Sequence, residues 1–277
     1  MPVHLVLIDA LNLIRRIYAV QERPFLHNSE LADNTKKQVL FNTIQACEKA
    51  LLNILELQKP THALALFDSE TPCWRYQIYP DYKKGRKKMP AHLADKLNDI
   101  QDVFMQNHVD SLGSEADEAD DLISTLAIKV ALRGQQVTIV STDKGFLSLI
   151  NQNIQVYDYF NRRYLDHHYV KEKFNVKPEQ LLDLWALTGD NTTNKIPGVP
   201  GIGQVTASQL LNQYGSLNAL LNAKDLKASL RDKLMENAEQ IQLSKTLLTL
   251  KLDIPLGFNL KDIRLPQEQT ASIHQQK

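Results

Sequence analysis

The chain has 277 residues, of which 43% are hydrophobic and 23% are charged, so it can bury a substantial core in one large domain or two modest ones. Its formal net charge of +0 at pH 7 excludes a uniformly basic nucleic-acid binder, although local basic patches can still bind phosphate. No apolar run approaches the roughly 18 residues that a membrane span requires, so we expect no membrane segment.

Cysteine usage and the N-terminal residues indicate the compartment. Only Cys47 and Cys73 occur, and the first residues lack the basic and apolar regions of a secretory signal. We therefore predict a reduced, cytoplasmic protein without a structural disulfide. The sequence shows no docking motif for a protein partner, and we expect a monomer.

Three apolar, β-rich runs predict buried parallel strands, and an aspartate closely follows each run. The runs are residues 3–8, 62–67 and 136–140, and the aspartates are Asp9, Asp68 and Asp143. Predicted helices over residues 34–57 and from about residue 118 separate these strands, and residues 154–159 predict a fourth strand. Right-handed crossovers then give a parallel α/β sheet whose ligands bind at the carboxyl ends of its strands. We expect the three aspartates to meet at that edge.

The most acidic stretch places five carboxylates within the seven residues from Glu115 to Asp121. Such close like charges repel one another, and Mg²⁺, which prefers carboxylate ligands, would offset them. The alternative is a solvated helix start, where the helix dipole favours acids and Ser114 with Asp117 resembles a capping box. The aspartates at three strand ends favour metal-assisted phosphoryl chemistry.

The one strongly basic block lies between Pro80 and Pro90. It contains Lys83, Lys84, Arg86, Lys87 and Lys88, and aromatic residues at Trp74, Tyr76, Tyr79 and Tyr82 accompany it. Basic residues interleaved with aromatic faces suit single-stranded nucleic acid, whereas the alternative is a solvated loop. The next helix carries an apolar stripe that predicts core packing, formed by Leu93, Leu97, Ile100 and Phe104.

Beyond residues 160–180 the chain becomes largely helical by pattern. Residues 196–207 place three glycines and two prolines in a short turn between helices, which predicts a helix-hairpin-helix motif. The amides at the start of the second helix can bind phosphate. Orphan carbonyls at the end of the preceding helix, around Leu187 and Thr188, can join hairpin carbonyls to hold a monovalent cation.

Together these motifs resemble the 5′-nuclease family, which comprises flap endonucleases and the 5′-nuclease domain of bacterial DNA polymerase I. The similarity covers nearly the whole chain, which looks like a free-standing member. Its motif residues are Asp9 with Arg16, Asp68, Trp74-Arg75, Tyr82-Lys83, Gly85-Arg86, Glu118-Ala-Asp120-Asp121, Thr142-Asp143-Lys144, Gly189-Asp190 and the hairpin.

The resemblance implies an α/β fold: a central, mostly parallel sheet flanked by helices (a PIN-like 5′-nuclease core), followed by a C-terminal helix-hairpin-helix (H3TH) region. We expect the core over residues 1–165, with a basic arch segment at about 72–108. The helical region is expected over 166–265, and a polar tail over 266–277.

The resemblance also implies residue roles. The first metal site would use Asp9, Asp68, Glu118, Asp120 and Asp121, and the second would use Asp143 and Asp190. Lys83 and Arg86 would stabilise the scissile phosphate, and Tyr82 would stack on a terminal base. The duplex backbone would contact Gly201, Ile202, Gly203, Gln204, Val205 and Thr206. Carbonyls of Leu187, Thr188, Pro197, Val199 and Ile202 would hold K⁺.

Within the acidic stretch two Glu-Ala-Asp triplets compete for the family register. The paired Asp120 and Asp121 favour the triplet that begins at Glu118, which leaves Glu115 and Asp117 as cap and solvent-facing acids. The family's Asp-Lys-Asp is Asp143-Lys144-Gly145 here, and its Ser-Asp-Asn is Thr192-Thr193-Asn194. We therefore expect one well-held Mg²⁺ and a second that is weak or held through water.

The resulting hypothesis is a Mg²⁺-dependent, structure-specific 5′ flap endonuclease that cleaves branched DNA with metal-activated water, with weak 5′-3′ exonuclease activity at most. One alternative is a catalytically weak or inactive protein that binds flap junctions, because the second metal site is incomplete. Another is an RNA-directed nuclease, against which the duplex-binding hairpin counts.

Overall fold

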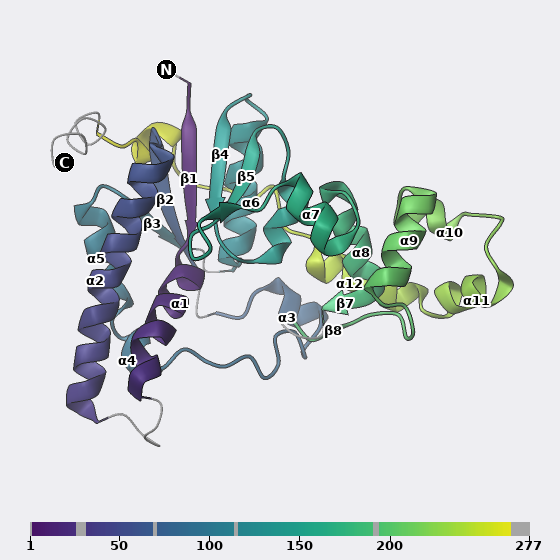
Figure 1. The fold of residues 1–277 in the computed structure, drawn as a ribbon, viewed down its shortest axis with the longest axis horizontal. Helices are drawn as coiled ribbons and strands as arrows, with labels where there is room; N and C mark the ends of the chain where they lie inside the picture. The colour runs from purple at the N-terminus through teal and green to yellow at the C-terminus, as the bar shows by residue number, and fades with distance from the viewer. Residues whose placement is uncertain (1, 26–31, 69–70, 114–115, 191–193, 267–277) are drawn as a thin grey trace.

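The computed structural model describes residues 2–25, 32–68, 71–113, 116–190 and 194–266. A six-stranded sheet in the order β3-β2-β1-β4-β5-β6 forms the centre of the core (Figure 1). Its strands are β1 (His4–Asp9), β2 (His62–Phe67), β3 (Asp110–Gly113), β4 (Gln136–Val140), β5 (Ile154–Asp158) and β6 (Arg163–Tyr164). All neighbouring pairs are parallel except β5 with β6.

Helices cover both faces of this sheet because successive side chains of a strand point to opposite faces. On β1, Val6 and Ile8 pack into one apolar core, whereas Leu5 and Leu7 pack into the other. The first core includes α1 (Ala10–Glu22), α2 (Asp33–Gln58), α4 (Ala91–Ala94) and α5 (Leu97–Gln106). The second contains α6 (Ala119–Ala131) and extends into the C-terminal helical region.

The strand register brings the carboxyl ends of the central strands level with one another. Asp9 pairs with Leu66 of β2, and Ile8 pairs with Val140 of β4. Asp9 therefore lies between β2 and β4, within one residue of the position where each of these strands ends. The side chains that follow these ends must share one small region.

The helical region lies to one side of the core (Figure 1). Its helices are α7 (His167–Phe174), α8 (Leu181–Thr188), α9 (Gln204–Tyr214), α10 (Leu217–Leu221), α11 (Ala228–Glu236) and α12 (Ala238–Leu248). A two-stranded ribbon of β7 (Gly189–Asp190) and β8 (Ile196–Pro197) connects α8 to the hairpin. The short α3 (Trp74–Ile78) packs nearby, because Cys73 and Tyr82 share an apolar cluster with Ile196 and Leu247. Four 3₁₀ turns complete the described elements, at Arg23–Phe25, Lys144–Leu149, Pro178–Gln180 and Leu260–Ile263.

The predicted fold class and the four predicted strands are confirmed, with boundaries within a residue or so. Helix α1 and strand β3 were not predicted, and the apolar stripe that follows the basic block is divided between α4 and α5. No helix in the described ranges is long and apolar enough to cross a membrane.

Candidate active site

Aspartates from three strands converge at the carboxyl edge of the sheet, as the sequence predicts. Asp9 is the last residue of β1 and caps α1, and its Oδ2 accepts a hydrogen bond from Ser141 Oγ at 2.6 Å. Asp68 follows β2 and accepts from the backbone N–H of Ala119 at 2.8 Å, which joins this strand end to the start of α6. Asp143 follows β4 and accepts from the N–H of Gly145 at 2.7 Å. Asp9 and Asp143 therefore cap the helical turns that follow their strands and also converge with Asp68 at the sheet edge.

The charges of these carboxylates act on one another and on Asp120. Burial, together with the nearby charges of Asp143 and Asp68, raises the pKa of Asp9 to about 7, although hydrogen bonds from Ser141 Oγ and the N–H of Asn12 oppose this shift. Burial also raises the pKa of Asp120 well above its ordinary value, with Asp143, Asp9 and Asp68 adding to the effect. Repelling, partly desolvated carboxylates of this kind are the donor set that a hard divalent cation takes.

The side chains are not already arranged as a metal site. Among the described residues, no group of three or more His, Cys, Asp and Glu side chains has a geometry that could hold a metal ion. Instead, Asp9, Asp68 and Asp143 accept the hydrogen bonds given above. Binding a cation here requires these carboxylates to exchange some of those contacts for the metal.

Arg75 separates two of the predicted metal ligands from this group. Its guanidinium forms a two-pronged ion pair with Asp121, at 2.7 and 2.8 Å, and a third contact with Glu118 Oε2 at 2.7 Å. It also donates to the carbonyls of Leu247, near the end of α12, and of Thr249, the C-cap of that helix. Burial lowers the pKa of Arg75, but Asp121 and Glu118 more than reverse this. Arg75 therefore connects α3, α6 and the helical region.

The prediction of Asp121 as a metal ligand does not fit this arrangement. Its side chain is fully buried and its oxygens accept from Arg75, Trp74 Nε1 and the N–H of Lys251. Asp117 also differs from the prediction of a solvent-facing acid, because it pairs with Lys251 at 2.7 Å and is only 14% exposed. Ser114 and Glu115, and with them the predicted capping box, lie outside the described residues.

Glu118 is held by residues 75–86 of the predicted arch segment, the arch base. Besides Arg75, it accepts from Tyr82 OH at 3.1 Å and forms an ion pair with Lys83 Nζ. Burial lowers the pKa of Lys83, but the charge of Glu118 raises it above the ordinary value, so this lysine stays charged. Lys83 also has a left-handed backbone with φ 53°, and its N–H donates to the carbonyl of Asn194. Glu118 must leave these donors to serve as a metal ligand.

The ring of Tyr82 is not available for stacking, which corrects that prediction. It is 4% exposed and packs with Cys73, Ile196 and Leu247, so it supports the arch base against β8.

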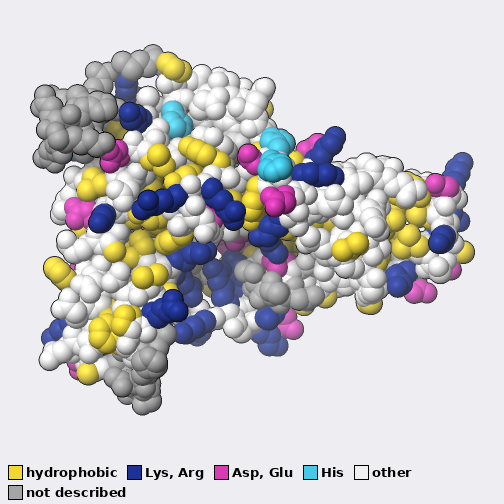
Figure 2. All heavy atoms as spheres, in the orientation of Figure 1, with side chains coloured by type: hydrophobic (Ala, Val, Ile, Leu, Met, Phe, Trp, Pro, Cys, Tyr) yellow, Lys and Arg dark blue, Asp and Glu magenta, His cyan; other side chains and the backbone are white. Residues whose placement is uncertain are grey.

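Arg86, by contrast, is exposed, and its charge lowers the pKa of Arg15, although burial contributes more to this shift. Arg15 on α1 donates to the carbonyl of Lys87 and is a further basic residue beside the arch segment, which was not predicted because α1 itself was not predicted. Figure 2 shows Lys and Arg side chains gathered where the core meets the helical region.

At the predicted second site, Asp190 is occupied by protein donors. Lys144 Nζ lies 2.8 Å from its Oδ1 and Asn194 Nδ2 lies 2.7 Å from its Oδ2. A Cβ added at Gly145 would lie 3.2 Å from Asp143 Oδ1, so any side chain here would begin in close contact with Asp143. Gly145 itself contributes no carboxylate beside Asp143. Thr192 and Thr193 lie outside the described residues.

The hairpin brings two backbones into direct contact. A Cβ at Gly198 would lie 2.2 Å from the carbonyl carbon and oxygen of Thr188, so only glycine allows this approach. Gly201 has φ 76°, Gly203 caps α9, and Val205 is 70% exposed. The hairpin thus presents the start of α9 to solvent, as a backbone-binding motif requires.

Most of the carbonyls predicted to hold K⁺ already accept hydrogen bonds. Leu187 accepts from the N–H of Val199, and Val199 accepts from that of Ile202. The carbonyl of Pro197 accepts from both Gln240 Nε2, at 3.0 Å, and Ser244 Oγ, at 2.9 Å. Since a carbonyl oxygen has two lone pairs, Pro197 does not fit the predicted set.

Comparison with known proteins places both halves of the chain. Residues 4–175 match the family described as 5′-3′ exonuclease, N-terminal resolvase-like domain, and residues 176–271 match the 5′-3′ exonuclease, C-terminal SAM fold. The flap endonuclease Xni of Colwellia psychrerythraea is 65% identical, with 98% of this chain and 95% of that protein covered. The Xni protein of Aeromonas hydrophila is 48% identical, with 97% and 98% covered.

Two solved structures share the fold. T5 5′-exonuclease with bound zinc aligns with a TM-score of 0.70 at 19% identity, over 88% of this chain and 89% of its own. The catalytic core of Rad2 in complex with DNA substrate aligns with a TM-score of 0.54 at 13% identity, over 94% and 83%.

Proposed function

The chain belongs to the 5′-3′ exonuclease family that includes the flap endonucleases named Xni, and we propose that it hydrolyses phosphodiester bonds at 5′ flaps of branched DNA. The observation that carries this proposal is the group of mutually repelling carboxylates at the sheet edge, next to the basic base of the arch segment. An exposed helix-hairpin-helix lies beyond them in the helical region.

Asp9, Asp68, Asp120 and Asp143 are proposed to hold a divalent cation, with Mg²⁺ as the expected ion. When bound, such an ion lowers the pKa of a water and neutralises charge on the phosphate. Glu118 joins this set when it exchanges Lys83 and Tyr82 for the cation. Asp190 with Asp143 supplies a second, weaker position, because Gly145 adds no carboxylate and Lys144 already neutralises Asp190.

The residues of the arch base position the DNA. Lys83, once freed from Glu118, places its ammonium beside the scissile phosphate, and the exposed Arg86 binds a neighbouring phosphate. Arg75 keeps the arch base and α6 in a fixed relation, so that Lys83 and Asp120 act on the same phosphate. Tyr82 supports Lys83 from within the apolar cluster.

The hairpin is proposed to bind the duplex backbone through the amides of residues 201–206 at the start of α9. A K⁺ ion held by the carbonyls of Leu187, Thr188, Val199 and Ile202 would rigidify this turn, with Pro197 left out of the set. We also propose that residues 1–165 carry the chemistry and residues 166–265 carry duplex binding, in a monomer.

The test is cleavage of a 5′-labelled flap substrate in Mg²⁺ by the full chain, compared with Asp120→Ala. We expect a short product released from the flap by the unmodified chain only. No product above the Asp120→Ala background would exclude the enzyme in favour of a protein that only binds junctions. Faster cleavage of RNA hairpins than of DNA flaps would overturn the choice of substrate.

A further inference from the structure

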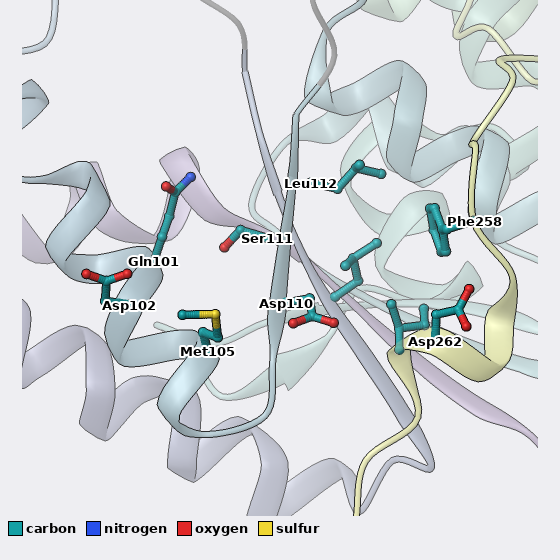
Figure 3. Close-up of a pocket in the computed structure, with 10 residues that line it drawn as sticks. Gln101, Asp102, Met105, Asp110, Ser111, Leu112, Phe258 and Asp262 are labelled. Atoms are coloured by element: carbon teal, nitrogen blue, oxygen red, sulfur yellow. The ribbon is translucent and has the colours of Figure 1, made fainter.

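A groove of about 470 Å³ lies at the free edge of the sheet. It is lined by Leu64, Gln101, Asp102, Met105, Asp110, Ser111, Leu112, Phe258, Asp262 and Ile263. Strand β3 runs along it, with α5 on one side and the C-terminal segment that contains Phe258 and Asp262 on the other (Figure 3). Its strand residues include Asp110, the first of β3, so the groove reaches the end of the strand opposite the aspartate cluster.

The outer edge of β3 carries no partner strand among the described residues. Within the described part of the chain, β3 pairs only with β2 and ends the sheet order. Three of its four residues are exposed, and only Leu112 is half-buried. An edge of this kind presents unpaired backbone donors and acceptors, which an extended peptide can satisfy by adding a strand.

The side chains around this edge have a clear chemical preference. Three carboxylates line the groove, from Asp102, Asp110 and Asp262, and none of its described lining residues is Lys, Arg or His. Apolar contacts come from Met105, which is 58% exposed, and from Phe258 and Leu112. Such a surface repels a nucleic-acid backbone. It attracts positively charged groups, in particular those of a peptide whose basic residues alternate with apolar ones.

We propose that this groove binds an extended segment of a partner protein in which Lys or Arg alternates with apolar residues, and that the segment adds to β3 as a seventh strand. Side chains of an extended peptide alternate between two directions, so basic residues can meet the acidic wall while apolar ones contact Met105 and Phe258. The groove lies away from the proposed active site, so a partner bound here can remain on the enzyme while DNA is processed.

The probe is a fluorescein-labelled eight-residue peptide library that alternates Lys or Arg with Val, Leu or Ile, titrated with the full chain and followed by fluorescence anisotropy. A library of the same design with Glu in place of the basic residues is the first control. We expect saturable binding of basic peptides only. Selected peptides N-methylated at alternate residues should lose binding, because methylation removes the strand hydrogen bonds.

The location is tested with Asp102→Lys/Asp110→Lys, and Glu56→Lys on exposed α2, a single charge reversal, is the control for a charge change elsewhere on the surface. The double variant should weaken binding by about tenfold or more, which corresponds to about 1.4 kcal/mol, while Glu56→Lys changes it little. Methyl NMR of Met105 should shift on addition of peptide. Absence of saturable binding, equal loss in both variants, or undiminished binding of the N-methylated peptides would overturn the proposal. Flap cleavage is independent of these measurements, so failure of this proposal is distinct from failure of the nuclease assignment.

Discussion

Asp120 and Asp121 are adjacent in sequence but lie in opposite electrostatic environments. Asp121 is fully buried and neutralised by the two-pronged contact with Arg75. Asp120 faces three other carboxylates, and its pKa is raised by burial and by their charges, although the charge of Lys83 opposes them. Successive residues on a helix point about 100° apart, so the first turn of α6 directs one acid to the arch base and the other to the sheet edge.

This difference separates a stabilising carboxylate from one held ready for a cation. A paired buried acid contributes to the fold as long as its partner is present, whereas an unpaired acid in a group of like charges destabilises the fold until a cation neutralises it. Substitution of Asp120 should therefore lower activity without lowering stability. Breaking the ion pair of Asp121 should instead lower stability first.

The largest effect is expected for Asp120→Asn. Loss of a carboxylate that holds the cation should lower flap cleavage by about 100- to 1,000-fold, since electrostatic stabilisation worth several kcal/mol is removed. The metal-free variant should be at least as stable as the unmodified chain, because one repelling charge is gone. Urea unfolding in EDTA and single-turnover cleavage measure both. A variant that is clearly destabilised yet active would reverse the assignment of Asp120.

Arg75→Gln should cost stability first. It leaves Asp121 buried and unpaired, and breaking such a pair from one side typically costs about 3–5 kcal/mol. The measurement is the midpoint of urea unfolding. The double variant Arg75→Gln/Asp121→Asn removes both charges and should recover much of the loss. If the double variant is no more stable than Arg75→Gln alone, the ion pair is not what holds the arch base to α6.

Asp121 also shows how far the sequence could predict the site. Apolar runs ending in aspartate predict Asp9, Asp68 and Asp143 at one sheet edge, because strand direction and crossover handedness determine where they meet. Two adjacent acids at a helix start look alike in sequence, however, and their difference depends on Arg75, which lies 46 residues from Asp121. Likewise, β3 was missed because Asp110–Gly113 contains a single strongly apolar residue, and its edge position requires no more.

Stability of the metal-free protein should fall as pH rises. The pKa of Asp9 is about 7 in the folded state and 3.8 ordinarily, so between these values the folded state binds more protons than the unfolded one. The contribution is therefore greatest below pH 3.8 and is lost as pH increases toward 7. Unfolding in EDTA across pH 5–8 should show this slope, and Asp9→Asn should flatten it. A slope that is unchanged in Asp9→Asn would exclude Asp9 as its source.

The smallest effect is expected for Gly145→Asp, which adds a carboxylate beside Asp143. The Cβ would lie 3.2 Å from Asp143 Oδ1, so a slight adjustment is needed. We expect tighter binding of a second Mg²⁺ by a few-fold and slightly lower stability without metal, because one more negative charge joins the cluster. Gly145→Asn is the control of the same shape. Equal metal affinity in both variants would show that charge at this position does not matter.

Titration calorimetry with Mg²⁺ tests the contrast between the two acids most directly. The comparison uses the unmodified chain, Asp120→Asn, and the charge-neutral double variant Arg75→Gln/Asp121→Asn. We predict that Asp120→Asn loses the tighter binding event, whereas the double variant keeps it within a few-fold. Retained binding in Asp120→Asn together with its loss in a folded double variant would contradict the account.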